Sequence, residues 1–221
     1  MWQVLKKELW FPDPRDAVSL GTLNGLVAVG GDLSIERLVL AYRSGIFPWS
    51  ADPITWWSPD PRGILELDEL HISRSLAKVL RQEHFRVTRN QAFREVMREC
   101  AAPRPDREKT WIAPKFLEAY GRLHDVGHAH SVECWQNDVL VGGVYGVQVG
   151  GLFAGESMFH TVSNASKVAL VHLVNHLAER GFRLFDIQMV SPHTESLGAR
   201  RIGREEFLRR LREAVRQKSK F

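Results

Sequence analysis

The fold is decided by two neighbouring stretches of sequence, GGLFAGESMFHTVSNASKVALVHL (residues 150–173) and FRLFDIQMVSPHTESLGARRI (residues 182–202). The first predicts a strand, a polar turn and a helix, because a strand-like apolar run is followed by polar residues and then by apolar positions at helical spacing. The second opens with a strand, in which side chains two positions apart point to the same face. That rule predicts Asp186 and Gln188 on one face, about 6.6 Å apart along the strand. One small substrate group could then contact both side chains.

The residues before these stretches change from helical to strand patterns near residue 130. Strands joined by hairpin turns are predicted at residues 131–136, 139–149 and 151–159. Apolar positions at helical spacing predict a helix that opens at Asn164 and ends before Gly181, and a closing helix lies near 204–217. A meander, a helix, a further strand and a closing helix indicate an α+β domain over residues 63–221.

Residues 1–62 are expected to form a small N-terminal lobe that buries its aromatic side chains against the rest of the chain. The segment WFPDP (residues 10–14) is rigid, because each proline restricts its own backbone and that of the residue before it. Ser34 is suited to cap a short helix that Gly45 ends. Further helices are predicted after Ser73, through the apolar stripe of residues 93–101, and over residues 114–124.

Composition excludes several classes of protein. The 221 residues contain no apolar run of the roughly 18 needed to span a membrane, and the N-terminus lacks the pattern of a signal peptide. Cys100 and Cys134 are isolated, so neither a disulfide scaffold nor a zinc site is indicated. His124, His128 and His130 have no acid-rich partners, and no metal is expected. The expected compartment is the cytoplasm.

The positive charge of the chain is concentrated at its C-terminus. Residues 200–221 hold nine basic and three acidic side chains, a net charge of +6 within a chain of net charge +4. A predicted basic stripe on the last helix consists of Arg209, Arg212, Arg216 and Lys220. It could follow nucleic acid phosphates without reading sequence. A solvated helix face is the alternative explanation of such a run.

The order of elements in the second half is similar to that of GNAT-type N-acyltransferases. In that fold a coenzyme A pyrophosphate lies on backbone N–H groups at a helix N-terminus, reached through a glycine-containing turn. The corresponding turn here, residues 160–164, contains no glycine, so side chains would obstruct the pyrophosphate. The sequence therefore favours acyl transfer from a donor other than coenzyme A.

Ten short motifs run in order along nearly the whole chain. They are FPDP (11–14), AVGGDLS (28–34), GIFPW (45–49), WWSPDPRG (56–63), TWI (110–112), GHAHSVE (127–133), GESMF (155–159), NASK (164–167), DIQ (186–188) and SLGA (196–199). In these motifs the chain resembles the leucyl/phenylalanyl-tRNA–protein transferase family. The resemblance implies transfer of Leu, Phe or less often Met from aminoacyl-tRNA to the α-amine of proteins with N-terminal Arg or Lys, which marks them for N-degron degradation. It also implies a cytoplasmic enzyme; we expect a monomer that needs no cofactor.

The same resemblance implies that Asp186 and Gln188 are the catalytic residues. An aminoacyl ester is already activated, so catalysis reduces to aligning the amine, managing its proton and stabilising developing charge. Our hypothesis is that Gln188 hydrogen-bonds the attacking amine, while Asp186 orients Gln188 and favours departure of the proton. A solvated polar strand face is the alternative explanation of this pair.

Further residues are candidates for binding substrate. An apolar pocket for the Leu or Phe side chain is predicted from Phe153, Met158, Leu170, Leu173 and Phe185. Trp49 and Trp111 could flank the terminal adenosine by stacking. Glu156 could bind either the cationic side chain of the acceptor or a ribose hydroxyl.

Two other functions remain open at this level. The first is an acetyl-coenzyme A-dependent N-acetyltransferase, against which the glycine-free turn argues. The second is a non-enzymatic RNA-binding module, which would explain the basic C-terminus and assign no role to Asp186 and Gln188.

Overall fold

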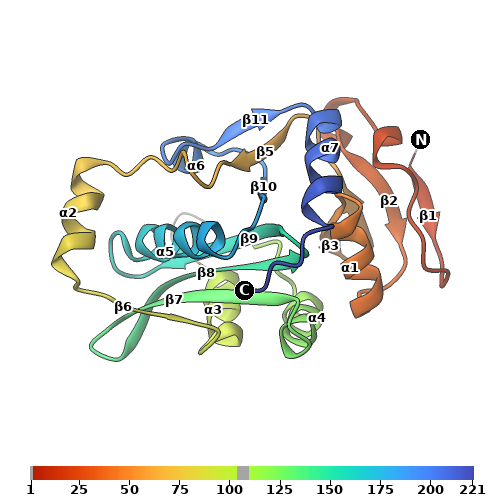
Figure 1. Cartoon of the computed structure of the whole chain (residues 1–221). Helices are drawn as coiled ribbons and strands as arrows, with labels where there is room; N and C mark the ends of the chain where they lie inside the picture. The colour runs from red at the N-terminus through yellow and green to blue at the C-terminus, as the bar shows by residue number, and fades with distance from the viewer. Residues whose placement is uncertain (1, 104–109) are drawn as a thin grey trace.

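Two β-sheets carry the fold, which a computed structural model describes for residues 2–103 and 110–221 (Figure 1). The smaller sheet has the strand order β1-β2-β4-β3. Its strands are β1 (Gln3–Leu5), β2 (Leu26–Gly30), β3 (Phe47–Ala51) and β4 (Ile54–Trp57). Helix α1 (Ile35–Arg43) connects β2 to β3, and the hydroxyl of Ser34 caps it by accepting the N–H of Arg37, as predicted.

The larger sheet has seven strands in the order β11-β5-β10-β9-β8-β7-β6. They are β5 (Arg62–Leu65), β6 (Arg86–Arg89), β7 (Ala129–Gln136), β8 (Val139–Val149), β9 (Leu152–His160), β10 (Leu184–Gln188) and β11 (Arg200–Ile202). The predicted meander is confirmed, because β7, β8 and β9 pair antiparallel in sequence order. Strand β10 then pairs parallel to β9. The α+β class is therefore confirmed.

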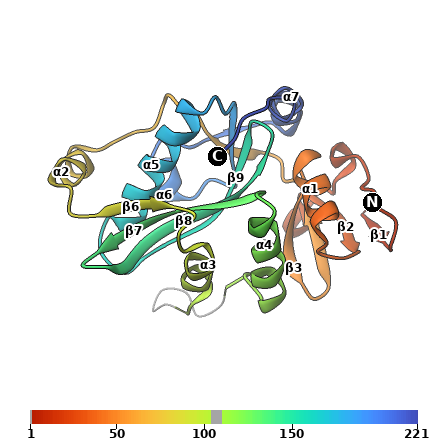
Figure 2. The same cartoon turned by 60° about the horizontal axis from the view of Figure 1, so that its bottom comes forward.

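Helices cover both faces of the larger sheet (Figures 1 and 2). Helix α5 (Ala165–Glu179) packs on one face of the meander, and α3 (Phe93–Ala101) and α4 (Pro114–Asp125) lie on the other. The predicted stripe of α3 is buried at Phe93, Val96, Met97 and Cys100, at the spacing of one helix face. The short helices η1 (Pro14–Asp16), η2 (Gly21–Leu23) and α6 (Pro192–Glu195), and helix α2 (Arg74–Gln82), complete the connections.

The small sheet and the larger sheet share one core. Leu38 and Tyr42 of α1 belong to the same buried cluster as Tyr120 of α4 and Val147 of β8. The chain passes from one sheet to the other between β4 and β5, so the predicted boundary after residue 62 falls at the start of β5. This arrangement places the end of β3 opposite the end of β10, where the site lies.

The last helix, α7 (Arg204–Ala214), is shorter than the predicted helix over 204–217. The chain beyond it is held by Gln148, whose amide donates to the Ser219 carbonyl at 2.7 Å and accepts the N–H of Phe221 at 3.2 Å. The Phe221 ring stacks on His130 with a centroid distance of 4.3 Å. Because these contacts draw the chain away from the helix axis, Arg216 and Lys220 do not continue the helical stripe. That part of the prediction is wrong.

Within the described residues, no helix is both long enough and apolar enough to cross a membrane.

Candidate active site

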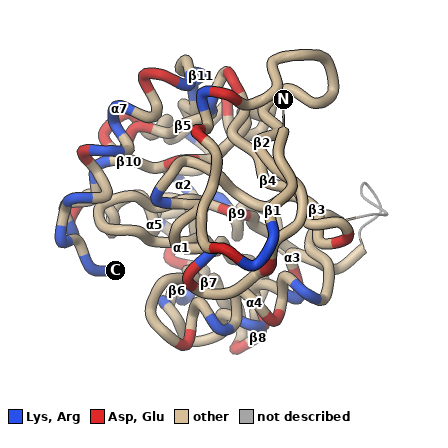
Figure 3. Tube along the Cα trace, turned by 90° about the vertical axis from the view of Figure 1, so that its right-hand side faces the viewer, with Lys and Arg blue, Asp and Glu red and all other residues tan. Residues whose placement is uncertain are grey.

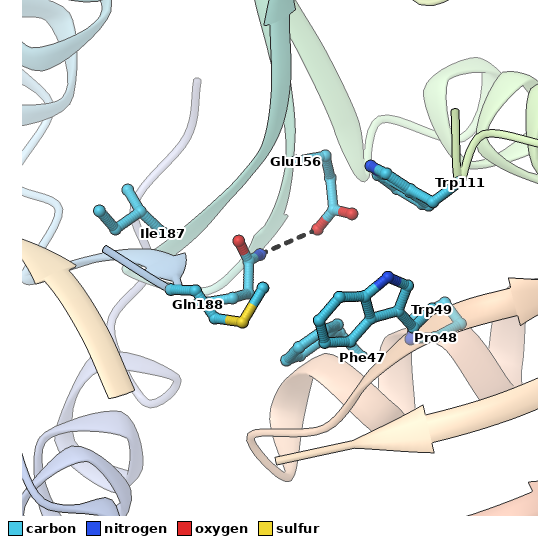
Figure 4. A pocket seen from close by; sticks show the side chains of 8 residues that line it. Phe47, Pro48, Trp49, Trp111, Glu156, Ile187 and Gln188 are labelled. Atoms are coloured by element: carbon cyan, nitrogen blue, oxygen red, sulfur yellow. Dashed lines mark hydrogen bonds between the residues drawn. The ribbon is translucent and has the colours of Figure 1, made fainter. Parts of the chain in front are cut away.

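Two neighbouring pockets meet at the end of β10. The first, which we call the aromatic pocket, has a volume of about 180 Å³ and is lined by Phe47, Pro48, Trp49, Trp111, Glu156, Ile187, Gln188 and Met189 (Figure 4). The second, the apolar pocket, has a volume of about 130 Å³ and is lined by Leu65, Val144, Gly155, Glu156, Ser157, Met158, Leu170, Phe185, Ile187, Gln188 and Thr194. Glu156, Ile187 and Gln188 line both, so a ligand that fills both pockets must pass these three residues.

Two tryptophans form the wall of the aromatic pocket. Trp49 lies on β3 and Trp111 lies just before α4, so they come from different parts of the fold (Figure 4). Trp57 packs edge-to-face with Trp49 at a centroid distance of 5.3 Å, and Phe116 packs in the same way with Trp111 at 5.4 Å. These contacts hold both indole rings in place for stacking on a planar ligand.

The apolar pocket contains three of the five side chains predicted for it, Met158, Leu170 and Phe185. Phe153 and Leu173 do not line it. The Phe153 ring packs against Phe185 at 5.9 Å within the buried core, and Leu173 is buried in the same cluster. Sequence alone does not separate these cases, because a pocket wall and a core position both require an apolar side chain.

Glu156 lies at the junction of the pockets and is held by two tyrosines that sequence analysis missed as site residues. Tyr42 donates to its Oε1 at 2.8 Å, and Tyr120 donates to its Oε2 at 3.2 Å. The two tyrosine hydroxyls also hydrogen-bond each other. Burial raises the pKa of Glu156 to about 8, against the lowering effect of the tyrosine hydrogen bonds and Arg62, and the Asp186 charge raises it further.

Asp186 lines neither pocket, because Arg62 holds its carboxylate. Nε and Nη2 of Arg62 donate to the two carboxylate oxygens at 2.9 and 2.7 Å, and both side chains are at most 2% exposed. Nη1 of Arg62 donates to the Gly45 carbonyl at 3.1 Å, and the guanidinium lies over the rings of Phe47 and Phe207. Arg62 belongs to the WWSPDPRG motif, but nothing in the sequence predicts its partner.

Gln188 departs from the extended geometry that the period-2 rule assumes. Its φ is +56°, and the register of β10 against β5 shifts between Asp186 and Gln188. The Gln188 N–H donates to Oδ1 of Asp186 at 2.9 Å, whereas its side-chain amide donates to Glu156 at 3.2 Å (Figure 4). The predicted arrangement of two side chains along one extended face is therefore wrong. Asp186 contacts Gln188 through the backbone, and the Gln188 side chain is directed to Glu156.

The basic residues of α7 are partly neutralised by acids on the same helix (Figure 3). Arg209 pairs with Glu206 and Glu213, both at 2.9 Å. Hydrogen bonds from Arg209 and Arg210 hold the pKa of Glu206 at about 2. Arg212 is exposed beside a shallow pocket that Arg43 also lines. Arg216 and Lys220 are exposed beyond the helix.

Metal binding finds no support in the part of the chain that the structure describes, since it contains no group of three His, Cys, Asp or Glu side chains suited to hold an ion. His124 is bonded instead to the carbonyl of Ala129 at 2.8 Å, and His130 lies 3.1 Å from the amide of Asn90.

Comparison with known proteins identifies relatives along the whole chain. A family described as leucyl/phenylalanyl-tRNA protein transferase matches residues 64–212, and the N-terminal domain of that family matches residues 31–60. Curated proteins named leucyl/phenylalanyl-tRNA–protein transferase include one from Tolumonas auensis, 52% identical over 94% of this chain and 88% of its own length. Another, from Nitrosospira multiformis, is 57% identical over 87% of this chain and 84% of its own length.

Among solved structures, L-PGS from Bacillus licheniformis is 12% identical, with a TM-score of 0.40 over 75% of this chain and 53% of that chain. A likeness this weak supports no conclusion.

Proposed function

This chain belongs to the leucyl/phenylalanyl-tRNA protein transferase family, and from that premise we propose how its two pockets divide the donor substrate. The donor carries leucine, phenylalanine or less often methionine, and the acceptor is the α-amine of a protein that begins with Arg or Lys. The observation that carries the proposal is that an aromatic pocket and an apolar pocket meet at Glu156 and Gln188. An aminoacyl-adenosine has the same two parts, joined by the reactive ester.

The terminal adenosine occupies the aromatic pocket, with its base against Trp49 and Trp111. Stacking of a base on an aromatic side chain contributes about 1–3 kcal/mol. The amino acid side chain occupies the apolar pocket. Such a pocket distinguishes one methylene by only about 1–3 kcal/mol, which agrees with a family that accepts Leu, Phe and Met. The ester carbonyl then lies beside Gln188, at the junction.

Gln188 orients the attacking amine. Its Nε2 is engaged by Glu156, so its Oε1 faces the task of accepting an amine N–H. Asp186 is a positioning residue in this scheme, because it fixes the Gln188 backbone while Arg62 neutralises its charge. Alignment of a neutral amine with an activated ester supplies a large part of the acceleration without any covalent intermediate.

We also propose that the larger domain is GNAT-like, on the evidence of its antiparallel meander and the parallel β9–β10 pair that follows. The first turn of α5 packs directly on β8, since a Cβ at Gly142 would lie 2.5 Å from the Cβ of Ala165. This close packing and the glycine-free turn support aminoacyl-tRNA over coenzyme A as the donor. The tRNA substrate supports a cytoplasmic location, and one complete site in one chain supports a monomer.

A transfer assay tests the function. The protein is incubated with labelled Leu-tRNA and a peptide that begins with Arg, and labelled peptide is the expected product. The same peptide with an N-terminal Asp should remain unlabelled. Label transferred from acetyl-coenzyme A instead, or binding of tRNA without any transfer, would contradict the proposal. Asp186→Ala and Gln188→Ala should both lower the rate.

Replacement of Trp111 tests the place of the adenosine. Trp111→Ala removes one stacking surface, so the Kd of a leucyl-adenosine analogue should rise by about 5- to 150-fold, the equivalent of about 1–3 kcal/mol. Isothermal titration calorimetry measures the change. Trp135→Ala is the matched control, because Trp135 lies on β7 and lines neither pocket. An unchanged Kd in Trp111→Ala would place the adenosine elsewhere.

Charge reversal beyond α7 tests the predicted tRNA surface. The double variant Arg212→Glu and Arg216→Glu should weaken tRNA binding at low salt and flatten its dependence on salt, because each lost phosphate contact releases fewer counterions. Filter binding over a series of salt concentrations measures both. Arg98→Glu on α3 is the control, since α3 lies on the far side of the larger sheet from α5. Equal tRNA affinity in the double variant and the wild type would exclude this surface.

A further inference from the structure

The hydrogen bonds around Glu156 require one more proton than its tyrosine partners supply. Three contacts close a ring: Tyr42 to Tyr120, Tyr42 to Oε1 of Glu156, and Tyr120 to Oε2 of Glu156. Each contact needs one proton between its two oxygens, and the two tyrosine hydroxyls carry two. When Glu156 is ionised, one contact brings two lone pairs together. When Glu156 carries a proton, all three contacts are hydrogen bonds.

The surroundings of the ring keep the extra proton on Glu156 and not on the tyrosines. Burial raises the pKa of Tyr42 and Tyr120 well above their usual value, so both remain neutral hydroxyls. The charged side chains that face Glu156 are Asp186, which raises its pKa, and Arg62, which lowers it. These two are bound to each other, which reduces the effect of both charges.

Glu156 also occupies the right place. It lines both pockets, and its Oε1 accepts the amide N–H of Gln188, the side chain that orients the amine. Asp186, the other carboxylate near β10, lines neither pocket and is enclosed by Arg62. Between these two carboxylates, only Glu156 can meet the reacting groups.

Resting on the proposed function, we propose that Glu156 is a catalytic residue that takes the proton lost by the attacking amine and returns it to the ribose oxygen of the departing tRNA. The amine nitrogen bonds to the ester carbonyl carbon and gives one proton to Glu156. The bond between that carbon and the ribose oxygen breaks, and the oxygen takes the proton from Glu156. The carboxylate ends unchanged, so the step needs no other reactant.

The pH dependence of kcat/KM for the acceptor tests this role. Glu156 must start ionised, and the acceptor amine, whose pKa is near 8, must start neutral. Below pH 7 two deprotonations are therefore required, and log kcat/KM should rise with a slope of two. In Glu156→Gln only the amine titrates, so the slope should fall to one, and kcat/KM at pH 9 should fall by about 100- to 10,000-fold.

Three controls separate proton transfer from a structural role. Glu156→Gln should bind leucyl-adenosine as the wild type does. Tyr42→Phe keeps the carboxylate and should retain the slope of two, with its inflection moved to higher pH because a hydrogen bond that lowers the Glu156 pKa is lost. Glu156→Ala leaves space in which added formate should restore part of the rate.

The proposal is overturned if Glu156→Gln retains a slope of two, if its rate at pH 9 lies within threefold of the wild type, or if formate restores nothing. These outcomes are separate from a failure of the proposed function. In that case the wild-type protein itself would not move leucine from tRNA to the Arg peptide.

Discussion

Arg62→Met should destabilise the protein by about 3–5 kcal/mol, because the substitution leaves the Asp186 carboxylate buried without a partner. The two side chains are at most 2% exposed and joined by two hydrogen bonds, so neither charge reaches water when the other is removed. Urea unfolding followed by tryptophan fluorescence measures the change. If the variant is too unstable to purify, Asp186→Asn gives the same comparison from the other side of the pair.

Two further variants show whether the cost comes from the unpaired charge. Arg62→Met combined with Asp186→Leu replaces the pair by apolar groups and should recover much of the lost stability. Arg86→Met is the matched control, since Arg86 pairs with Asp138 in solvent at 3.2 Å and its removal should cost less than about 1 kcal/mol. Strictly additive losses in the double variant would mean that Arg62 and Asp186 stabilise the fold independently.

Leu170→Trp should reduce transfer from Phe-tRNA by about 10- to 150-fold, by filling the apolar pocket. Leu170 lines this pocket of about 130 Å³, and an indole there takes space that the donor side chain needs. The loss corresponds to the roughly 1.5–3 kcal/mol that burial of a Phe side chain contributes. Leu-tRNA should lose less, because its side chain is smaller. Competition between Phe-tRNA and Leu-tRNA for one Arg peptide measures the shift.

Adenosine without an amino acid should bind Leu170→Trp as it binds the wild type, since the aromatic pocket is untouched. Leu80→Trp is a control on the same type of residue, because Leu80 lies on α2 and lines neither pocket. An equal loss for the Phe and Leu donors, with adenosine binding intact, would mean that the donor side chain lies outside this pocket.

Elements held together by local patterns were predictable from the sequence. The helix cap at Ser34, the buried stripe of α3 and the meander of β7, β8 and β9 all depend on residues close together in the chain. The short strands of the small sheet were not predicted. β1, for example, has three residues and depends on parallel pairing with β2, more than twenty positions away.

The candidate site was predictable only in part. Trp49, Trp111 and Met158 line the pockets as proposed, whereas Phe153 and Leu173 have the same apolar character and lie in the core. No local pattern distinguishes the two groups, because the difference depends on which neighbours leave a space.

The sequence by itself determined the class of the fold, the order of the meander and the helix that follows it, and the family to which the chain belongs. These properties depend on hydrophobic periodicity and on motifs that are read along the chain. Only the tertiary structure decided which carboxylate meets the pockets. Arg62 reaches Asp186 across 124 positions, and Tyr42 reaches Glu156 across 114, so folding buries one acid in an ion pair and leaves the other beside the substrate. The physical reason is that burial and partners, which set the charge and reach of a side chain, exist only once distant segments are packed together.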